Sequence, residues 1–206
     1  MKWQTGTRVD PKPCREQDNG KFEITCRDGQ ARLGKIHTKH GIVTTPCLLP
    51  VINPNIRTIE PREMWDKYGI QALITNSYVI WKHEKLKRTA ISKGVHSLLD
   101  YPGMIMTDSG TFQSYVYGDV EVGVEEIVQF QKEIGVDVAT MLDVFTRPDM
   151  TYSQVEKAVD ETISRGLTSV TSVDDMMLNG PIQGGVFPEL RVKSAKKMSE
   201  LDFSIH

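Results

Sequence analysis

The sequence lacks a strong excess of charge of either sign. Its 206 residues carry 25 lysines and arginines against 27 aspartates and glutamates, so the formal net charge is -2. This balance excludes a protein that is held to nucleic acid by bulk positive charge, but it leaves room for a local basic patch. The basic runs at Lys82–Arg88 and Lys193–Lys197 are interpreted as solvated helix faces, with phosphate contact as the alternative.

Long apolar runs are also missing. No stretch approaches the ~18 residues that a membrane-spanning helix needs, and residues 1–20 lack the apolar centre of a signal peptide. We therefore expect a cytoplasmic protein with no membrane partner. Residues 1–20 contain Pro11, Pro13 and many charges, and they are expected to form a flexible leader ahead of a folded part over residues 21–206.

Cysteine is scarce. Cys14, Cys26 and Cys47 are odd in number and widely spaced, which favours reduced thiols over a disulfide framework. The C-x2-C spacing of a zinc site is absent. His37 and His40 have an H-x2-H spacing, but no cysteine or carboxylate partner is evident beside them. We therefore predict neither a metal site nor a cofactor in this chain.

Three common catalytic or nucleotide-binding signatures do not occur. The sequence has no G-x4-G-K-[ST] and no G-x-G-x-x-G, so neither a P-loop nor a dinucleotide fingerprint is supported. It also has no G-x-S-x-G nucleophile elbow.

Short apolar runs alternate with helical patterns, which is typical of βα units around a parallel sheet. The expected strands are residues 47–52, 72–75, 104–107, 138–142, 181–183 and 203–205. The expected helices start at Pro61, run over 124–134 and 155–163, and start again at Pro188. Ahead of these units, residues 22–45 are predicted to form antiparallel strands, with turns at Asp28-Gly29 and His40-Gly41.

The strand count leaves two α/β architectures open. Six parallel strands fit an open, doubly wound sheet. At about 29 residues per unit, a (β/α)8 barrel needs roughly 230 residues from its first strand, so a barrel made by this chain would stop about two strands early. The chain then ends at Ile205-His206, in or just after an apolar strand, which leaves an exposed sheet edge.

Carboxylates follow two of the expected strands, at the end where sites of parallel α/β folds lie. Asp108 and Asp143 come after runs that are neighbours along the chain, and adjacent strands are ~4.8 Å apart. Two carboxylates that close raise the pKa of one of them, which suits acid/base chemistry. Taken alone, the pair suggests a glycosidase-like mechanism. Helix caps or Asx-turns are the alternative interpretation.

Three further positions have both a binding and a structural interpretation. Phe112 is either a core aromatic or a platform for a planar base. Gln183 carries a donor and an acceptor that match a purine edge, or it satisfies backbone at a strand end. Gly184-Gly185 allows a ligand to approach the backbone closely, or it is a simple turn.

The segment Met106–Gln113 contains Asp-Ser-Gly-Thr-Phe-Gln and resembles the Asp-Ser-Gly-x-Phe-Gln signature of tRNA-guanine transglycosylases. At position 111 the sequence has threonine rather than glycine, and in this it resembles the archaeal, archaeosine-forming branch. Other segments similar to that branch are residues 34–38, 49–55, 74–78, 117–121 and 142–146. The resemblance runs from about Phe22 to His206.

The resemblance implies a (β/α)8 TIM-barrel-type fold, incomplete at about six strands, with an N-terminal antiparallel β cap. It also implies an enzyme that exchanges guanine at position 15, in the tRNA D-arm, for preQ0 in archaeosine biosynthesis. The reaction would be a double displacement, in which a carboxylate first displaces guanine from the ribose and the incoming base then displaces the carboxylate. The implied partners are tRNA, guanine and preQ0.

The resemblance also assigns roles to individual residues. Asp108 would be the catalytic acid/base carboxylate beside the ribose. Asp143 would accept hydrogen bonds from guanine N1 and the 2-amino group. This role takes the place of the second catalytic carboxylate that the residues alone suggested. Gln183 would reach the purine carbonyl. The other pocket residues would be Ser109, Gly110, Phe112, which stacks on the base, and Gly184.

Several parts of the family pattern have no counterpart in this sequence. They are the nucleophilic aspartate near the last barrel strand, the Cys-x-Cys-x2-Cys and His zinc ligands, and the C-terminal tRNA-binding domains. The sequence therefore resembles the amino-terminal portion of the catalytic domain. Three hypotheses follow: an enzyme part that needs a second chain for the last strands, nucleophile and zinc site; a non-catalytic paralogue or regulatory subunit; or a fragment that folds poorly alone.

Overall fold

The computed structural model describes residues 9–113, 122–173 and 175–206. The chain forms two compact units, which are described separately. The first consists of residues up to Asn76 together with Ile80–Thr107 and Ile134–Asp137, and the second of Ser77–Val79, Asp108–Glu133 and Val138–His206.

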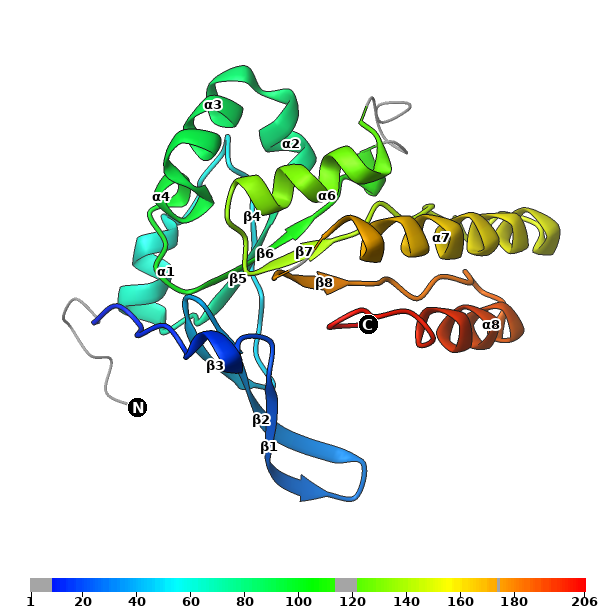
Figure 1. The fold of residues 1–206 in the computed structure, drawn as a ribbon, viewed down its shortest axis with the longest axis horizontal. Helices are drawn as coiled ribbons and strands as arrows, with labels where there is room; N and C mark the ends of the chain where they lie inside the picture. Colours follow the sequence, from blue (N-terminus) through cyan, green and yellow to red (C-terminus); the bar gives the residue numbers. More distant parts are fainter. Residues whose placement is uncertain (1–8, 114–121, 174) are drawn as a thin grey trace. The chain divides into compact units, whose positions relative to one another are not determined.

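An antiparallel sheet opens the first unit. Its strands are β1 (Phe22–Asp28), β2 (Ala31–Thr38) and β3 (Gly41–Thr45), in the order β1-β2-β3 (Figure 1). Both predicted turns are confirmed: Asp28 pairs with Ala31, and Thr38 pairs with Gly41. Gly29 and Gly41 have φ angles of 56° and 112°, a backbone conformation that glycine adopts readily. Every residue of β1 is exposed.

Residues of the expected leader run beside β2. A 3-10 turn, η1, covers Glu16–Asp18. The Cys14 N–H donates to Thr38 O at 3.1 Å, and the Gly20 N–H donates to His37 O at 2.9 Å. These backbone bonds fix the chain around η1 to the end of β2.

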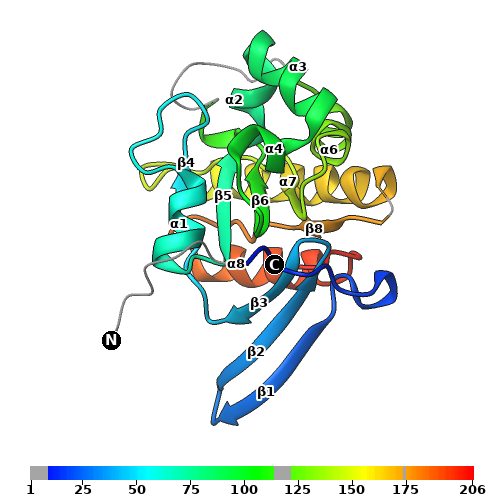
Figure 2. The same ribbon diagram turned by 90° about the vertical axis from the view of Figure 1, so that its left-hand side faces the viewer.

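The remaining elements of the first unit are short strands alternating with helices: β4 (Val51–Ile52), α1 (Pro61–Tyr68), β5 (Ala72–Asn76), α2 (Ser77–Lys82, which starts in the second unit), α3 (Glu84–Lys93), α4 (Val95–Leu99) and β6 (Met104–Asp108). Figure 2 shows β4, β5 and β6 side by side. Helix α1 has the predicted ends, because Pro61 lies in its first turn and Gly69, at φ 66°, ends it. Leu73, Ile105 and Leu99 are fully buried in the core of this unit.

The second unit contains α6 (Val124–Glu133), β7 (Val138–Thr140), α7 (Tyr152–Ser172), β8 (Met177–Asn179) and α8 (Pro188–Met198). Strands β7 and β8 pair in parallel, with Thr140 opposite Asn179. Thr151 and Gln154 form a capping box at the start of α7, which satisfies backbone donors there. Val155, Val159 and Leu190 join α7 and α8 in one apolar cluster.

A buried amide side chain completes the hydrogen bonds at the end of β7. Gln131 of α6 has no exposed surface. Its Oε1 accepts from the Thr140 N–H at 2.9 Å, and its Nε2 donates to Thr140 O at 3.0 Å. The amide therefore takes the place of a peptide group from a neighbouring strand.

Several predicted strands are wrong in detail: the one expected at 47–52 covers only Val51–Ile52, and the one expected at 138–142 ends at Thr140. The strand expected at 181–183 lies at Met177–Asn179 instead, where Met177 and Leu178 are buried. Pro181 has no N–H for a sheet ladder, which explains why the strand does not include it. The strand expected at 203–205 is reduced to a single parallel bridge between Ile205 and Asn179.

The order of the parallel strands decides between the two architectures. The five-stranded sheet has the order β4-β5-β6-β7-β8, which follows the chain. A doubly wound sheet reverses its order at a switch point, whereas barrel strands follow one another in sequence. The α/β class is confirmed, and the arrangement is consistent with a partial barrel. Within the described residues, no helix combines the length and apolar character that crossing a membrane requires.

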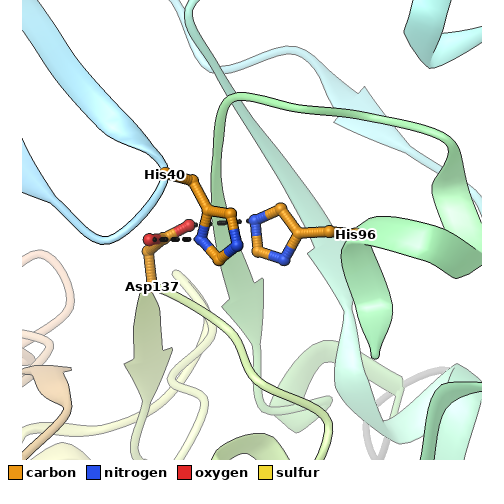
Figure 3. A group of neighbouring side chains, drawn as sticks. All are labelled: His40, His96 and Asp137. Atoms are coloured by element: carbon orange, nitrogen blue, oxygen red, sulfur yellow. Dashed lines mark hydrogen bonds and ion pairs between the residues drawn. The ribbon is translucent and has the colours of Figure 1, made fainter. Parts of the chain in front are cut away.

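Asp137 joins three segments of the first unit (Figure 3). Its side chain is completely buried. Oδ1 accepts from His40 Nδ1 at 2.9 Å, and Oδ2 accepts from His96 Nε2 at 3.1 Å and from the Ile105 N–H at 2.9 Å. Burial alone would raise the pKa of Asp137, but the hydrogen bonds and charges of the two histidines outweigh it and lower the pKa from 3.8 to about 2.

This lowered pKa predicts an acid-dependent loss of stability. Ionised Asp137 stabilises the folded state above pH 4, and the contribution is lost as the pH falls from about 4 to about 2. A shift of this size corresponds to about 2 kcal/mol. We expect urea unfolding to show that the free energy of unfolding of the parent chain falls over this pH range. The free energy of unfolding of Asp137→Asn should change less with pH over the same range. Asp149→Asn, at an exposed carboxylate, should keep the parent profile; a matching profile for Asp137→Asn would contradict the assignment.

Candidate functional site

Asp108 ends β6 and starts a tight loop in the second unit. Its Oδ1 accepts from the Gly110 N–H at 3.1 Å, and its main-chain oxygen accepts from the Ser77 hydroxyl at 2.7 Å. The first contact is the Asx-turn that the sequence offered as an alternative. The carboxylate is half-buried, so the turn orients it at the end of the strand.

Only glycine fits at position 110 of this loop. Gly110 has a φ of 97°, and a Cβ there would lie 2.3 Å from Cβ of Tyr78. Ser109 is completely buried, and its Oγ lies 3.4 Å from Oγ1 of Thr111. Ser109 and Gly110 therefore hold the shape of the loop around Asp108.

Asp143 follows β7 and is 9% exposed. Its main-chain oxygen accepts from Thr111 Oγ1 and from Arg165 Nη1, each at 3.3 Å. The next N–H, of Val144, donates to Thr162 Oγ1 at 3.0 Å. Side chains of α7 and of the Asp108 loop thus fix the backbone on which this carboxylate stands.

Gln183 and Asp143, which both follow strands, are in direct contact. Gln183 Nε2 donates to Asp143 Oδ2. Gln183 Oε1 accepts from Thr146 Oγ1 at 3.3 Å, and its main-chain N–H donates to Ser194 Oγ at 3.0 Å. These partners orient the amide, with its nitrogen toward the carboxylate and its oxygen toward Thr146.

Phe112 connects the loop that follows β6 with the loop that follows β7. Its ring packs edge-to-face on Phe145, with 5.7 Å between centroids and 80° between planes. The side chain is 49% exposed, so it is not the core aromatic of one interpretation. Together with the bond from Thr111 to Asp143, this contact joins the Asp108–Phe112 segment to the loop after β7.

The close backbone approach that Gly184 allows is made within the protein, to Arg191. The φ of Gly184 is 139°, and a Cβ there would lie 2.4 Å from the main-chain nitrogen of Arg191. Gly185, at φ 53°, follows it. The pair turns the chain after Gln183 into α8, and the ligand contact expected for Gly184 stays a prediction.

Several supporting residues were not singled out from the sequence. Phe145 and Thr146 lie in a segment that carried the family resemblance, so a signal for them was present. Arg165, in the middle of α7, gave no signal, because its contact with Asp143 spans 22 positions. The resembling segment at residues 117–121 lies outside the described residues.

The tight fit of Gly110 generates a prediction. Gly110→Ala places a methyl group against Tyr78 in a strained backbone conformation, so we expect a loss of about 3 kcal/mol in the free energy of unfolding. Chemical denaturation monitored by circular dichroism measures this loss. Gly123→Ala is the control, because the nearest atom to its new Cβ is 3.9 Å away; equal stabilities of the two variants would refute the proposed constraint.

Comparison of the sequence with known proteins identifies the family of the chain. The family model described as Queuine tRNA-ribosyltransferase matches residues 26–206. The tRNA-guanine(15) transglycosylase of Thermoplasma acidophilum is 50% identical over 185 residues, which are 90% of this chain and 29% of that protein. The protein of the same name from Methanosarcina acetivorans is 46% identical over 186 residues, 90% of this chain and 38% of that protein.

A third relative, the tRNA-guanine(15) transglycosylase of Methanopyrus kandleri, is 45% identical over 188 residues, 91% of this chain and 41% of that protein. The chain therefore spans less than half the length of these relatives. Since the family model covers nearly all of the sequence that forms the sheets and the site, the chain belongs to the tRNA-guanine transglycosylase family.

Proposed function

We propose that this chain forms the base-recognition part of a transglycosylase that exchanges guanine at position 15 of the tRNA D-arm for preQ0. The observation that carries the proposal is the contact between the Asp143 carboxylate and the Gln183 amide. This pair stands in a family whose relatives are named for action on guanine 15 of tRNA. Archaeosine biosynthesis in the cytoplasm is the corresponding setting.

The side chains of the site complement one edge of guanine. N1–H and the 2-amino group are neighbouring donors, and a carboxylate such as that of Asp143 accepts from both. The amide nitrogen of Gln183 carries a second hydrogen besides the one given to Asp143, and this hydrogen can bond to the purine carbonyl. The half-exposed ring of Phe112 offers a face for stacking. Ser109, Gly110 and Gly184 shape the loops that carry these side chains.

Asp108 supplies acid/base chemistry in this proposal. The glycosidic bond between ribose C1′ and guanine N9 breaks as a carboxylate oxygen bonds to C1′, and Asp108 protonates the leaving base. In the second half, Asp108 accepts the N9 proton of preQ0, which then bonds to C1′ and releases the carboxylate. The nucleophilic carboxylate belongs to a further segment or to a second chain, which also supplies the last strands, a zinc site and contacts to tRNA.

Base binding by the 206-residue chain tests the recognition half of the proposal. We expect calorimetry to detect binding of guanine and of preQ0. Asp143→Asn replaces one acceptor oxygen by a donor, so we expect ten- to hundredfold weaker binding, in line with about 1.5–3 kcal/mol for hydrogen bonds to a charged group. Asp149→Asn, at an exposed carboxylate of the same loop, should bind like the parent. Equal affinities of the parent chain and Asp143→Asn would refute the role of Asp143.

Exchange of labelled guanine into tRNA tests the catalytic half. The chain is mixed with candidate partner chains that carry the remaining strands and the zinc motif. We expect exchange in the productive mixture and at least a hundredfold loss with Asp108→Asn, because general acid–base catalysis contributes about 10²–10⁴-fold, while base binding persists. Base binding without exchange in any mixture would favour the alternative of a non-catalytic subunit or paralogue.

A further inference from the structure

We propose that His40, His96 and Asp137 form a binding site for a divalent transition-metal ion of the Zn²⁺ class (Figure 3). His40 lies in the turn between β2 and β3, His96 lies in α4, and Asp137 directly precedes β7. Each contributes one donor atom, and these atoms all lie within 4.8 Å of one another. All three residues belong to the first unit, whereas Asp108, Asp143 and Gln183 belong to the second.

The donor separations suit a shared ion. His40 Nδ1 lies 2.9 Å from Asp137 Oδ1, and His96 Nε2 lies 3.1 Å from Asp137 Oδ2. Two ligand atoms that each lie about 2.0–2.1 Å from one Zn²⁺, at angles of roughly 90–110°, are about 2.9–3.4 Å apart. Each imidazole nitrogen therefore lies at ligand spacing from one oxygen of the carboxylate, and the donor atoms of the two histidines lie within 4.8 Å of each other.

The two rings also set a condition on binding. They stack with 3.4 Å between centroids and 16° between planes. An imidazole nitrogen binds a metal in the plane of its ring, so one ring must turn out of the stack to share an ion with the other. The His40 side chain is 36% exposed and stands in a turn, whereas that of His96 is 15% exposed. His40 is therefore the ring that turns, and the ion takes the place of the two N–H protons.

The surroundings of Asp137 support this set of ligands. The Ile105 N–H holds Oδ2 at 2.9 Å, as outer-shell donors hold the carboxylates of metal sites. Two nitrogens with one carboxylate suit Zn²⁺ and similar ions, whereas Mg²⁺ and Ca²⁺ prefer oxygen ligands alone. His37, the other histidine of the H-x2-H spacing, lies 3.4 Å from Glu23 instead. The bound ion ties a turn, a helix and a strand end together.

Metal titration of the chelator-treated 206-residue chain tests the site. We expect calorimetry to show one Zn²⁺ per chain, no comparable binding of Mg²⁺, and a rise in Tm with Zn²⁺. His40→Gln and His96→Gln each remove a direct ligand, so each should weaken Zn²⁺ binding at least tenfold, because loss of an outer-shell partner alone costs about 10–100-fold. The ¹⁵N shifts of the imidazoles identify the nitrogens that bind the ion.

Two control variants separate this site from other zinc-binding groups. His37→Gln removes the neighbouring histidine, and Cys14→Ser removes the thiol of the residue whose main-chain N–H donates to Thr38 O, just before the turn. Both should bind Zn²⁺ like the parent chain. The proposal is overturned by an absence of saturable Zn²⁺ binding, or by affinity that His40→Gln and His96→Gln leave unchanged. Either result identifies the three residues as a hydrogen-bonded clamp only.

Discussion

The parallel pairing of β7 with β8 determines whether the candidate site exists. Thr140 lies opposite Asn179, and these are the last residues of the two strands, so β7 and β8 end side by side. Asp143 follows three residues after one strand, and Gln183 follows four residues after the other, which brings carboxylate and amide into contact. A slip of one residue in this pairing would turn every side chain of one strand to the opposite face. The contact between Asp143 and Gln183 therefore depends on backbone register as well as on the two residues themselves.

Most elements of the fold were predictable because their signals are local. Gly29 and Gly41 mark turns that need their conformations, and Pro61 with Gly69 marks both ends of a helix. The strand expected at 181–183 was misplaced because a three-residue strand is too short for periodicity to separate Met177–Asn179 from the apolar residues around Pro181. The parallel order of the sheet could only be inferred, since strand order depends on contacts between segments far apart in the sequence.

The site was predictable to the extent that its residues follow strands. That rule, with the family resemblance, selected the carboxylate and amide that meet after β7 and β8. It did not select Asp137, which precedes its strand and whose contacts with His40 and His96 span 97 and 41 positions. The H-x2-H spacing did not indicate the cluster, because His37 of β2 contacts Glu23, whereas His40, in the turn after that strand, contacts Asp137. Only the tertiary fold brings His40, His96 and Asp137 together.

The amide of Gln131 couples the identity of one helix residue to the end of a strand. Because this side chain closes both open peptide groups of Thr140, an apolar residue of the same size at position 131 would leave a buried N–H and a buried C=O without partners. The backbone of β7, and not the apolar packing of α6, therefore favours an amide at this helix position.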